Sequence, residues 1–294
     1  MNLLQLFVDG LSSGTLYVLL ALGLSLVFSV MGLINFAYGG LIVWSGYALY
    51  MLDAMGLPYP ISLAGMLVFA MALSMVVGRV AFLPFVGAPG ATLLLASFGV
   101  AMALQALAVM VFGEGPRVVP TPSALITSLD LGIVRVSVIQ LVALALGAAV
   151  LAGLDFLIRK TRYGIEIRAA AEDAATARLM AVRSSRVLML VFALSGFLAA
   201  IVAFVWFAQT GTVTPRADFN PTLKAFIAVV LGGLGTVRGA VIGGLALGML
   251  ESVLSATLDA PLSNYQQTLA FVLVILVLLL RPQGIAGKAL EFSK

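Results

Sequence analysis

Charged side chains inside apolar stretches are the residues of this sequence best placed to do chemistry. Glu251 lies deep in an apolar stretch with no evident partner among its sequence neighbours, whereas Asp155 stands four residues before Arg159. A charge at the centre of a bilayer costs about 3 kcal/mol, so such groups are generally paired or line a polar path. The four-residue spacing predicts a local ion pair for Asp155. For Glu251 two interpretations stay open: a buried hydrogen-bond acceptor, or a residue that lines a transport path.

The residue types that are missing exclude most enzyme chemistry. The sequence has no His and no Cys, which removes disulfides, thiol nucleophiles, His general bases and Cys/His metal sites. The glycine-rich run GGLGTVRG at 232–239 lacks the Lys-Ser/Thr pair that meets a phosphate in a P-loop. A membrane hydrolase could use only Ser/Lys or carboxylate chemistry, and no Ser accompanies Lys224. We therefore expect a protein that is not an enzyme, holds no metal or cofactor, and does not bind ATP itself.

The hydrophobicity of the chain indicates a membrane protein. Of its 294 residues 62% are hydrophobic, and its mean hydropathy is +1.17. Continuous apolar runs of about 18 residues or more indicate transmembrane helices rather than a barrel, whose strands would alternate. We predict an all-α polytopic membrane protein, with one transmembrane domain over residues 1–294 and about eight to nine helices, some short or broken. The expected spans are residues 11–30, 37–53, 61–82, 92–112, 136–158, 187–208, 223–234, 240–258 and 268–280.

The distribution of basic residues predicts the orientation in the membrane. Twelve of the 16 Lys and Arg residues fall on one side of a nine-span arrangement, most of them between residues 159 and 186. The other four are Arg117, Arg135, Arg216 and Lys224. Because Lys/Arg-rich loops stay in the cytoplasm, the C-terminus is expected there and the N-terminus outside. The neutral loop at 113–135 is then external. The first ten residues, MNLLQLFVDG, have no basic region or cleavage site, so the first span is expected to be retained.

The basic loop at 159–186 is expected to carry a docking element. Its centre, residues 169–182, is Ala-rich, has acids early and a base late, and contains neither Pro nor Gly. This pattern favours one short helix at the membrane surface. Its small-residue face, which would enter a groove on a cytoplasmic partner, comprises Ala170, Ala174, Ala177 and Ala181. The charged candidates for the same contact are Arg168, Glu172, Asp173 and Arg178.

Two glycine-containing interruptions separate apolar runs. Asn35, Tyr38, Gly39 and Gly40 follow the first run, and broken helices are tolerated in a membrane only where protein or a water-filled path satisfies the backbone. This segment is either a candidate lining of a translocation path or a plain turn. The run at 232–239 begins a series of small residues four apart, which favours close helix packing. It could also form a flexible cytoplasmic turn, whose candidate contact residues are Gly232, Gly233, Gly235 and Arg238.

Four sequence blocks together carry a resemblance to a known family. The first two are GTLYVLLALGLSLVFSVMGLINFAYGG at 14–40 and RVAFLPFVGAP at 79–89. The others are TRYGIEIRAAAEDAATARLMAV at 161–182 and LKAFIAVVLGGLGTVRGAVIGGLALGMLES at 223–252, the latter followed by RPQGIAG at 281–287. With these blocks the chain resembles the LivH-type permease subunits of branched-chain amino-acid ABC importers. The third and fourth blocks in this order form the most specific part of the resemblance, which covers almost the whole chain.

The resemblance implies a transport assembly in the bacterial inner membrane. Such permeases pair with a second, related permease, in a hetero- or homodimer. The pair sits on two cytoplasmic ATPase subunits, which bind the ATP, and receives substrate from a periplasmic or lipid-anchored binding protein. The resemblance makes residues 168–182 and the turn at 232–239 the expected ATPase contacts. The expected substrates are branched-chain or other hydrophobic amino acids.

One departure from the family pattern keeps the substrate open. Family members have a sequence close to INFAHGE where this chain has INFAYGG at 34–40, so Tyr38 and Gly40 replace a His and a Glu. Urea, short-chain amide and aromatic-compound importers use closely similar permeases and remain alternatives. A stand-alone secondary transporter or channel is the alternative from another class. It would show paired intramembrane charges or inverted repeats, whereas the sequence shows one deep acid and no clear repeat.

Overall fold

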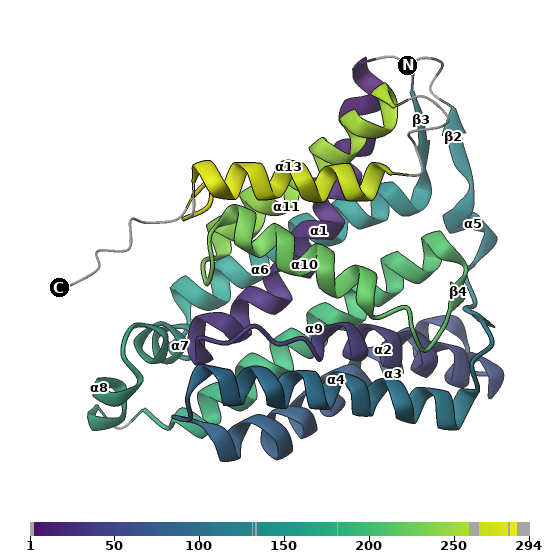
Figure 1. Ribbon diagram of the computed structural model, residues 1–294. Coiled ribbons are helices and arrows are strands. Elements are labelled where there is room, and N and C mark those ends of the chain that lie inside the picture. Colours follow the sequence, from purple (N-terminus) through teal and green to yellow (C-terminus); the bar gives the residue numbers. More distant parts are fainter. Residues whose placement is uncertain are drawn as a thin grey trace.

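The protein is a bundle of helices with a few two- or three-residue strands, shown as a computed structural model in Figure 1. The structure describes residues 3–130, 132, 134–180, 182–258, 265–281 and 283–286. The helices are α1 (Leu3–Met31), α2 (Tyr38–Ala54), α3 (Tyr59–Val77), α4 (Gly90–Phe112), α5 (Ser123–Ile126), α6 (Val138–Lys160), α7 (Arg162–Glu172), α8 (Ala174–Leu179), α9 (Ser184–Thr210), α10 (Phe219–Gly232), α11 (Val237–Thr257) and α13 (Gln266–Leu280). A π-helical turn, η1 (Gly78–Phe82), and a 3₁₀ turn, η2 (Leu83–Phe85), prolong α3. The strands are β1 (Arg117–Val118), β2 (Ser128–Asp130), β3 (Arg135–Ser137) and β4 (Thr212–Val213).

The predicted all-α membrane fold is confirmed, with a difference in the lengths of the spans. Among the described residues, six helices are long and apolar enough to cross a membrane: α1, α3 with its prolongation, α4, α6, α9 and α11. The other expected spans correspond to the shorter helices α2, α10 and α13. At 1.5 Å per residue, the 14 residues of α10 extend about 21 Å. This helix is therefore a half-helix, too short to cross a hydrocarbon core of about 30 Å.

One end of the bundle, here named the strand end, gathers the short strands and the start of α1. Arg117 of β1 pairs with Val213 of β4, and β2 pairs with β3 in antiparallel register. The Gln5 side chain of α1 accepts a 2.8 Å hydrogen bond from the Arg135 backbone N–H. These contacts bring β1, β2, β3 and β4 to the same end of the molecule (Figure 1).

The opposite end, here named the α7–α8 end, gathers the basic loop and the turn between α10 and α11. The end of α1, the helices α7 and α8 and the start of α9 lie there (Figure 1). The backbone N–H of Ile285 donates to the Leu231 carbonyl at 2.8 Å, so the segment after α13 returns to this end as well. The basic residues in the described part of the chain therefore divide between the two ends as the sequence predicts, Lys224 excepted.

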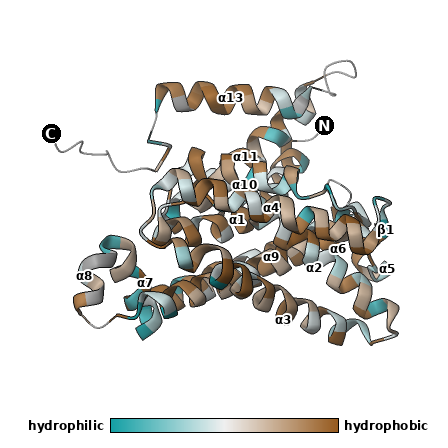
Figure 2. Ribbon diagram, turned by 60° about the horizontal axis from the view of Figure 1, so that its bottom comes forward, coloured by the Kyte–Doolittle hydropathy of each residue, from teal (hydrophilic) through white to brown (hydrophobic). Residues whose placement is uncertain are grey.

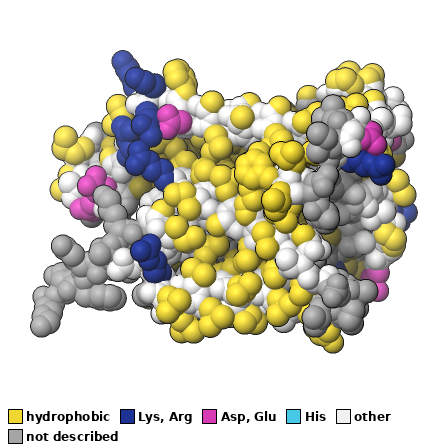
Figure 3. All heavy atoms as spheres, turned by 90° about the horizontal axis from the view of Figure 1, so that it is seen from above, with side chains coloured by type: hydrophobic (Ala, Val, Ile, Leu, Met, Phe, Trp, Pro, Cys, Tyr) yellow, Lys and Arg dark blue, Asp and Glu magenta, His cyan; other side chains and the backbone are white. Residues whose placement is uncertain are grey.

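An apolar band separates the two ends. In Figure 2 the helices between the ends are mostly hydrophobic, whereas hydrophilic residues gather at α7 and α8 and near β1 and α5. Figure 3 shows the same division on one face of the molecule, with Lys and Arg side chains at the two ends and hydrophobic side chains between them. A belt of exposed apolar residues between two charged rims is the surface expected of a protein that spans a bilayer.

The two halves of the chain form an inverted arrangement that the sequence does not reveal. The order of a long helix, a short helix and a long helix in α1–α2–α3 recurs in α9–α10–α11, but α1 and α9 run in opposite directions (Figure 1). Ser74 Oγ of α3 donates to the Phe192 carbonyl of α9 at 2.6 Å, and Ser252 Oγ of α11 donates to the Leu6 carbonyl of α1 at 2.8 Å. The sequence shows no clear repeat, so this similarity in element order is apparent only in the structure.

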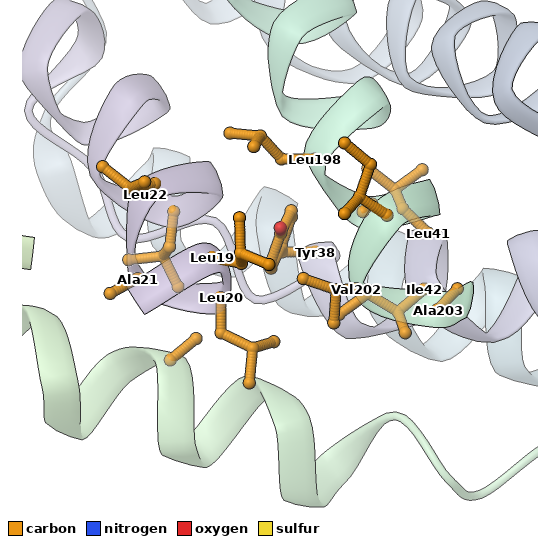
Figure 4. Close-up of a cluster of buried hydrophobic side chains, with 14 of the residues drawn as sticks. Leu19, Leu20, Ala21, Leu22, Tyr38, Leu41, Ile42, Leu198, Val202 and Ala203 are labelled. Carbon is orange, nitrogen blue, oxygen red and sulfur yellow. The ribbon is translucent and has the colours of Figure 1, made fainter. Parts of the chain in front are cut away.

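The core is formed by α1, α2 and α9, with α11 packed closely along α1. Figure 4 shows leucines of α1 against Leu41 and Ile42 of α2 and against Leu198 of α9. The predicted close packing of small residues is confirmed at Gly244 and Gly248 of α11. A Cβ at Gly244 would lie 2.5 Å from the Val18 backbone nitrogen, and one at Gly248 would overlap the backbone of α1.

Candidate translocation core and coupling surface

Two short helices begin next to each other inside the bundle. Residues 32–37 return from the end of α1 and lead into α2, and residues 214–218 lead from β4 into α10. A Cβ at Gly39, in the first turn of α2, would overlap the Asp218 carbonyl oxygen and the Thr222 hydroxyl of α10. The predicted interruption near Asn35 is therefore real, and it positions the starts of both short helices.

Other parts of the same chain bury the candidate path residues at this junction. Asn35 and Tyr38 are fully buried, and Asn35 Oδ1 accepts a 3.1 Å hydrogen bond from the Ala37 N–H just before α2. Tyr38 lies among the core leucines in Figure 4, with its hydroxyl against Gly23. Gly40 packs against Leu104 of α4, because a Cβ there would lie 2.9 Å from Leu104 Cδ1. Their role in lining a path stays a prediction.

Glu251 belongs to a polar cluster of three side chains, here named the Tyr17–Lys224–Glu251 cluster. Lys224 Nζ lies 2.9 Å from Glu251 Oε2, and the Tyr17 hydroxyl donates to the same oxygen at 2.5 Å. Lys224 Nζ also donates to the Tyr17 hydroxyl oxygen at 2.5 Å and lies 4.6 Å from the centre of the Tyr17 ring. The two charged side chains are only 14% and 12% exposed.

This cluster joins three helices in the apolar part of the molecule. Tyr17 comes from α1, Lys224 from α10 and Glu251 from α11. The expectation that Lys224 lies with the outer-side loop residues is wrong, because its side chain is inside the bundle. A buried ion pair resists the loss of either member, since the remaining charge is left uncompensated at a cost of about 3–5 kcal/mol. The cluster therefore fixes the half-helix α10 against α1 and α11.

The charged cluster is confined to one half of the inverted arrangement. Ser252 and Ser74 make matching hydrogen bonds in the two halves, and the residues that precede them are Glu251 and Leu73. The residue next to the bonded serine is therefore apolar in α3 and acidic in α11. Sequence reasoning found Glu251 by its depth but missed its partners, because Lys224 is 27 residues away and Tyr17 is 234 residues away.

The turn between α10 and α11 is shaped by glycines and held by neighbouring backbone. Gly233 and Gly235 have φ angles of 108° and 78°, a region that favours glycine. The Thr236 hydroxyl caps α11 by accepting from the Gly239 N–H at 3.0 Å. The N–H of Ala286 donates to the Gly232 carbonyl at 3.1 Å, so the segment after α13 braces the turn. Arg238 follows it with an exposed side chain.

The predicted single helix over 169–182 is wrong, because the chain breaks at Asp173. Helix α7 ends at Glu172, Asp173 adopts an extended conformation with φ −154° and ψ 103°, and α8 begins at Ala174. The Asp173 carboxylate accepts hydrogen bonds from the Thr176 N–H and hydroxyl, which starts the new helix.

The break also changes which side chains face outward. Ala170 and Ala177 are each only 5% exposed, so they pack against the chain itself. Leu179 and Met180, at the end of α8, are 87% and 77% exposed. Arg168, within α7, and Glu172, at the end of α7, are both exposed. The side chains of Ala174 and Arg178, and residue 181 altogether, lie outside the described part of the chain.

The predicted pair of Asp155 and Arg159, near the end of α6, is confirmed. Arg159 Nε lies 2.6 Å from Asp155 Oδ1, and both side chains are more than half exposed. A surface pair of this kind contributes little to stability. The pair therefore belongs to the charged rim of the bundle rather than to its interior.

Comparison with known proteins agrees with this architecture. Residues 6–278 match the family described as branched-chain amino acid transport system / permease component. The chain is 31% identical to the high-affinity branched-chain amino acid transport system permease protein BraD of Pseudomonas aeruginosa, over 97% of this chain and 96% of that protein. It is 32% identical to the corresponding protein LivH of Escherichia coli K12, with the same coverage.

A more distant likeness covers less than half of the chain. The ribose import permease protein RbsC of Haemophilus influenzae is 33% identical over 46% of this chain and 43% of its own length. No solved structure gives a significant match. The match over nearly the entire chain, together with the multi-span bundle, shows that the protein belongs to the family of permease components of branched-chain amino acid transport systems.

Proposed function

We propose that this chain is the membrane-spanning permease subunit of an ABC importer for branched-chain or other hydrophobic amino acids. The observation that carries the proposal is its similarity, over 97% of the chain, to permeases named for high-affinity branched-chain amino acid transport. The partners are a second permease, two cytoplasmic ATPase subunits and a substrate-binding protein. This chain supplies the path and the coupling surface, and the ATPase subunits supply the energy.

In this proposal the α7–α8 end faces the cytoplasm of a bacterial inner membrane. The basic loop at 159–186 lies at that end, and Lys/Arg-rich loops are retained on the cytoplasmic side. Residues Ile285 and Ala286, after α13, lie at the same end, which supports a cytoplasmic C-terminus. The start of α1 at the strand end is then outside, where a binding protein would dock.

Helix α8 is the proposed centre of the ATPase contact. Leu179 and Met180, at the end of α8, are large, highly exposed apolar side chains, and α8 lies at the edge of the α7–α8 end (Figure 1). Exposed apolar groups beside charged residues are typical of a protein interface. The braced turn at Gly232–Arg238 lies at the same end and is a second candidate contact.

The alternative of a stand-alone secondary transporter is tested by measuring whether uptake is driven by ATP or by an ion gradient. Inverted repeats and paired intramembrane charges are expected of such transporters, and this fold has both an inverted arrangement and the Lys224–Glu251 pair. These features therefore do not separate the two classes. Family membership favours the importer.

Uptake by cells tests the proposed substrate. The chain would be expressed with the second permease, ATPases and binding protein encoded beside it, in a host that lacks its own branched-chain amino-acid uptake. We expect accumulation of labelled leucine, isoleucine or valine that disappears when this subunit is omitted. Accumulation of urea, short-chain amides or aromatic compounds in place of these amino acids would assign the permease to one of the related importers.

A further inference from the structure

A cavity of about 460 Å³ opens at the α7–α8 end, outside the site described above. It lies between the end of α3 and the start of α9, and α7 forms one side of it. Its wall on the bundle side is apolar, with Met75 of α3 and Met189, Leu190 and Ala193 of α9. The cavity is therefore continuous with the membrane-spanning parts of two long helices.

Two arginines line the other side of the cavity. Arg79 projects from the π-helical turn η1, and Arg186 from the first turn of α9. Neither guanidinium has a carboxylate within 4.0 Å among the described residues, although Glu166 also lines the cavity. Tyr163 also lines the cavity. The cavity therefore combines apolar side chains with two arginines that have no carboxylate partner among the described residues.

The depth of the arginines matches the headgroup region of a bilayer. Arg79 lies near the end of the apolar segment Tyr59–Phe85, and Arg186 near the start of Ser184–Thr210. Figure 3 shows Lys and Arg side chains gathered where the apolar band stops at this end. At this level an arginine meets lipid phosphates, and the residues one to two turns deeper meet acyl chains.

We infer that this cavity binds one anionic phospholipid. The phosphate would accept charge-assisted hydrogen bonds from the Arg79 and Arg186 guanidinium groups, which suit phosphate oxygens in planar, two-pronged geometry. The first part of an acyl chain would lie along Met75, Leu190 and Ala193. Because the apolar wall runs into the membrane, a lipid fits the whole cavity, whereas an acidic segment of a soluble ATPase would reach only its rim.

The lipid would also link α7 to the bundle. Tyr163 belongs to α7, which leads into the proposed ATPase contact on α8, while Arg79 belongs to η1 and Arg186 to α9. A bound headgroup would therefore hold the start of the basic loop against the membrane-spanning helices. This binding does not depend on the identity of the transported substrate.

The test uses the purified chain in a neutral detergent, without ATPase subunits. Thermal unfolding would be followed as phosphatidylglycerol, phosphatidylcholine or soluble glycerol 3-phosphate is added, and bound lipid would be counted by native mass spectrometry. We expect one tightly held phosphatidylglycerol and a rise in Tm with that lipid only. Replacing either arginine should weaken the affinity by about tenfold, through loss of a charge-assisted hydrogen bond.

Two double variants test whether the preference for phosphatidylglycerol depends on the cavity. Arg79→Gln with Arg186→Gln should abolish the preference for phosphatidylglycerol, whereas Arg117→Gln with Arg216→Gln, two arginines at the strand end, should leave it intact. Equal effects of phosphatidylglycerol and phosphatidylcholine on the unmodified chain would overturn the proposal, with no variant needed. An equal effect of glycerol 3-phosphate would overturn it in favour of a free phosphate site. In a second experiment the Arg79/Arg186 variant would be co-purified with the ATPase subunits. Unchanged lipid binding with reduced ATPase co-purification would overturn the proposal and assign the cavity to the ATPase.

Discussion

Lys224 Nζ and Glu251 Oε2 lie 2.9 Å apart inside the apolar part of the bundle, and the Tyr17 hydroxyl lies within hydrogen-bond distance of both. The pair connects α10, which is too short to cross a membrane alone, to α11, and Tyr17 extends the connection to α1. In the first half of the fold, the residue before Ser74 is Leu73, whereas the residue before Ser252 is Glu251. The half-helix α10 is therefore held to α1 and α11 by polar contacts.

Breaking this pair from one side should destabilise the protein more than removing it altogether. Lys224→Met should lower the free energy of unfolding by about 3–5 kcal/mol, because the Glu251 carboxylate loses its cation in an apolar environment. Lys224→Met with Glu251→Leu should recover most of this loss. Arg159→Met, which breaks the exposed pair with Asp155, serves as the control and should cost less than about 1 kcal/mol. Denaturant unfolding of the purified protein in detergent measures all three. Equal losses for the single and double variants would show that the pair is not the stabilising unit.

Two tyrosines offer a matched comparison of a bonded and an unbonded hydroxyl. Tyr17→Phe removes a donor to the Glu251 carboxylate and should cost about 1.5–3 kcal/mol. Tyr38→Phe removes a buried hydroxyl that has no hydrogen-bond partner among the described residues, so it should leave the stability unchanged or raised. The same unfolding assay applies. A larger loss for Tyr38→Phe than for Tyr17→Phe would contradict the assigned hydrogen bonds.

The contact between the two short helices predicts a strict requirement at Gly39. Gly39→Ala would place a methyl group against the Asp218 carbonyl and the Thr222 side chain, so we expect a loss of about 1–3 kcal/mol from overpacking. Gly99→Ala in α4 has open space at its Cβ and should be neutral or stabilising by up to about 1 kcal/mol. If Gly39→Ala leaves unfolding and uptake unchanged, the starts of α2 and α10 can move apart, which would contradict the tight contact.

Exposed apolar residues of α8 should be required for ATPase binding. Leu179→Asp and Met180→Asp place a charge on the proposed contact and should reduce co-purification of the ATPase subunits and substrate uptake together. Membrane insertion and pairing with the second permease should be unaffected, because both side chains project from the bundle. Val118→Asp at the strand end, where the side chain is 72% exposed, is the control for co-purification of the ATPase subunits. Normal ATPase binding by both α8 variants would shift the contact to the turn at Gly232–Arg238.

Single cysteines in this Cys-free chain test the orientation. Ser123→Cys in α5 and Ser184→Cys at the start of α9 lie at opposite ends of the bundle. A membrane-impermeant thiol reagent applied to intact cells should label position 123 from outside, and position 184 only after the membrane is opened. Labelling of both positions from the same side would contradict the arrangement of α6 between them.

The sequence was sufficient for the fold class and for the elements that depend on local pattern. Long apolar runs, the short span at 223–234, the close packing at Gly244 and the Asp155–Arg159 pair all follow from neighbouring residues. The break at Asp173 was missed, because Ala-rich composition favours helix while the Asp carboxylate can instead cap a new one.

Long-range relationships could not be predicted in the same way. The partners of Glu251 lie 27 and 234 residues away in the sequence, and apolar residues at the corresponding positions of the other half hide the inverted arrangement. The burial of Ala170 and Ala177 likewise depends on how α7 and α8 fold back against the bundle. These features arise from tertiary packing, which overrides local helix propensity.

The energy source of transport tests the account most directly. The chain, its partner permease and the ATPase subunits would be reconstituted in proteoliposomes, and uptake of labelled leucine delivered by the binding protein would be measured with ATP at the ATPase side. The account predicts uptake that requires ATP, the ATPase subunits and the binding protein, and that persists when ion gradients are collapsed. Uptake by this chain alone, driven by a proton or sodium gradient without ATP, would contradict it and would make the protein a secondary transporter.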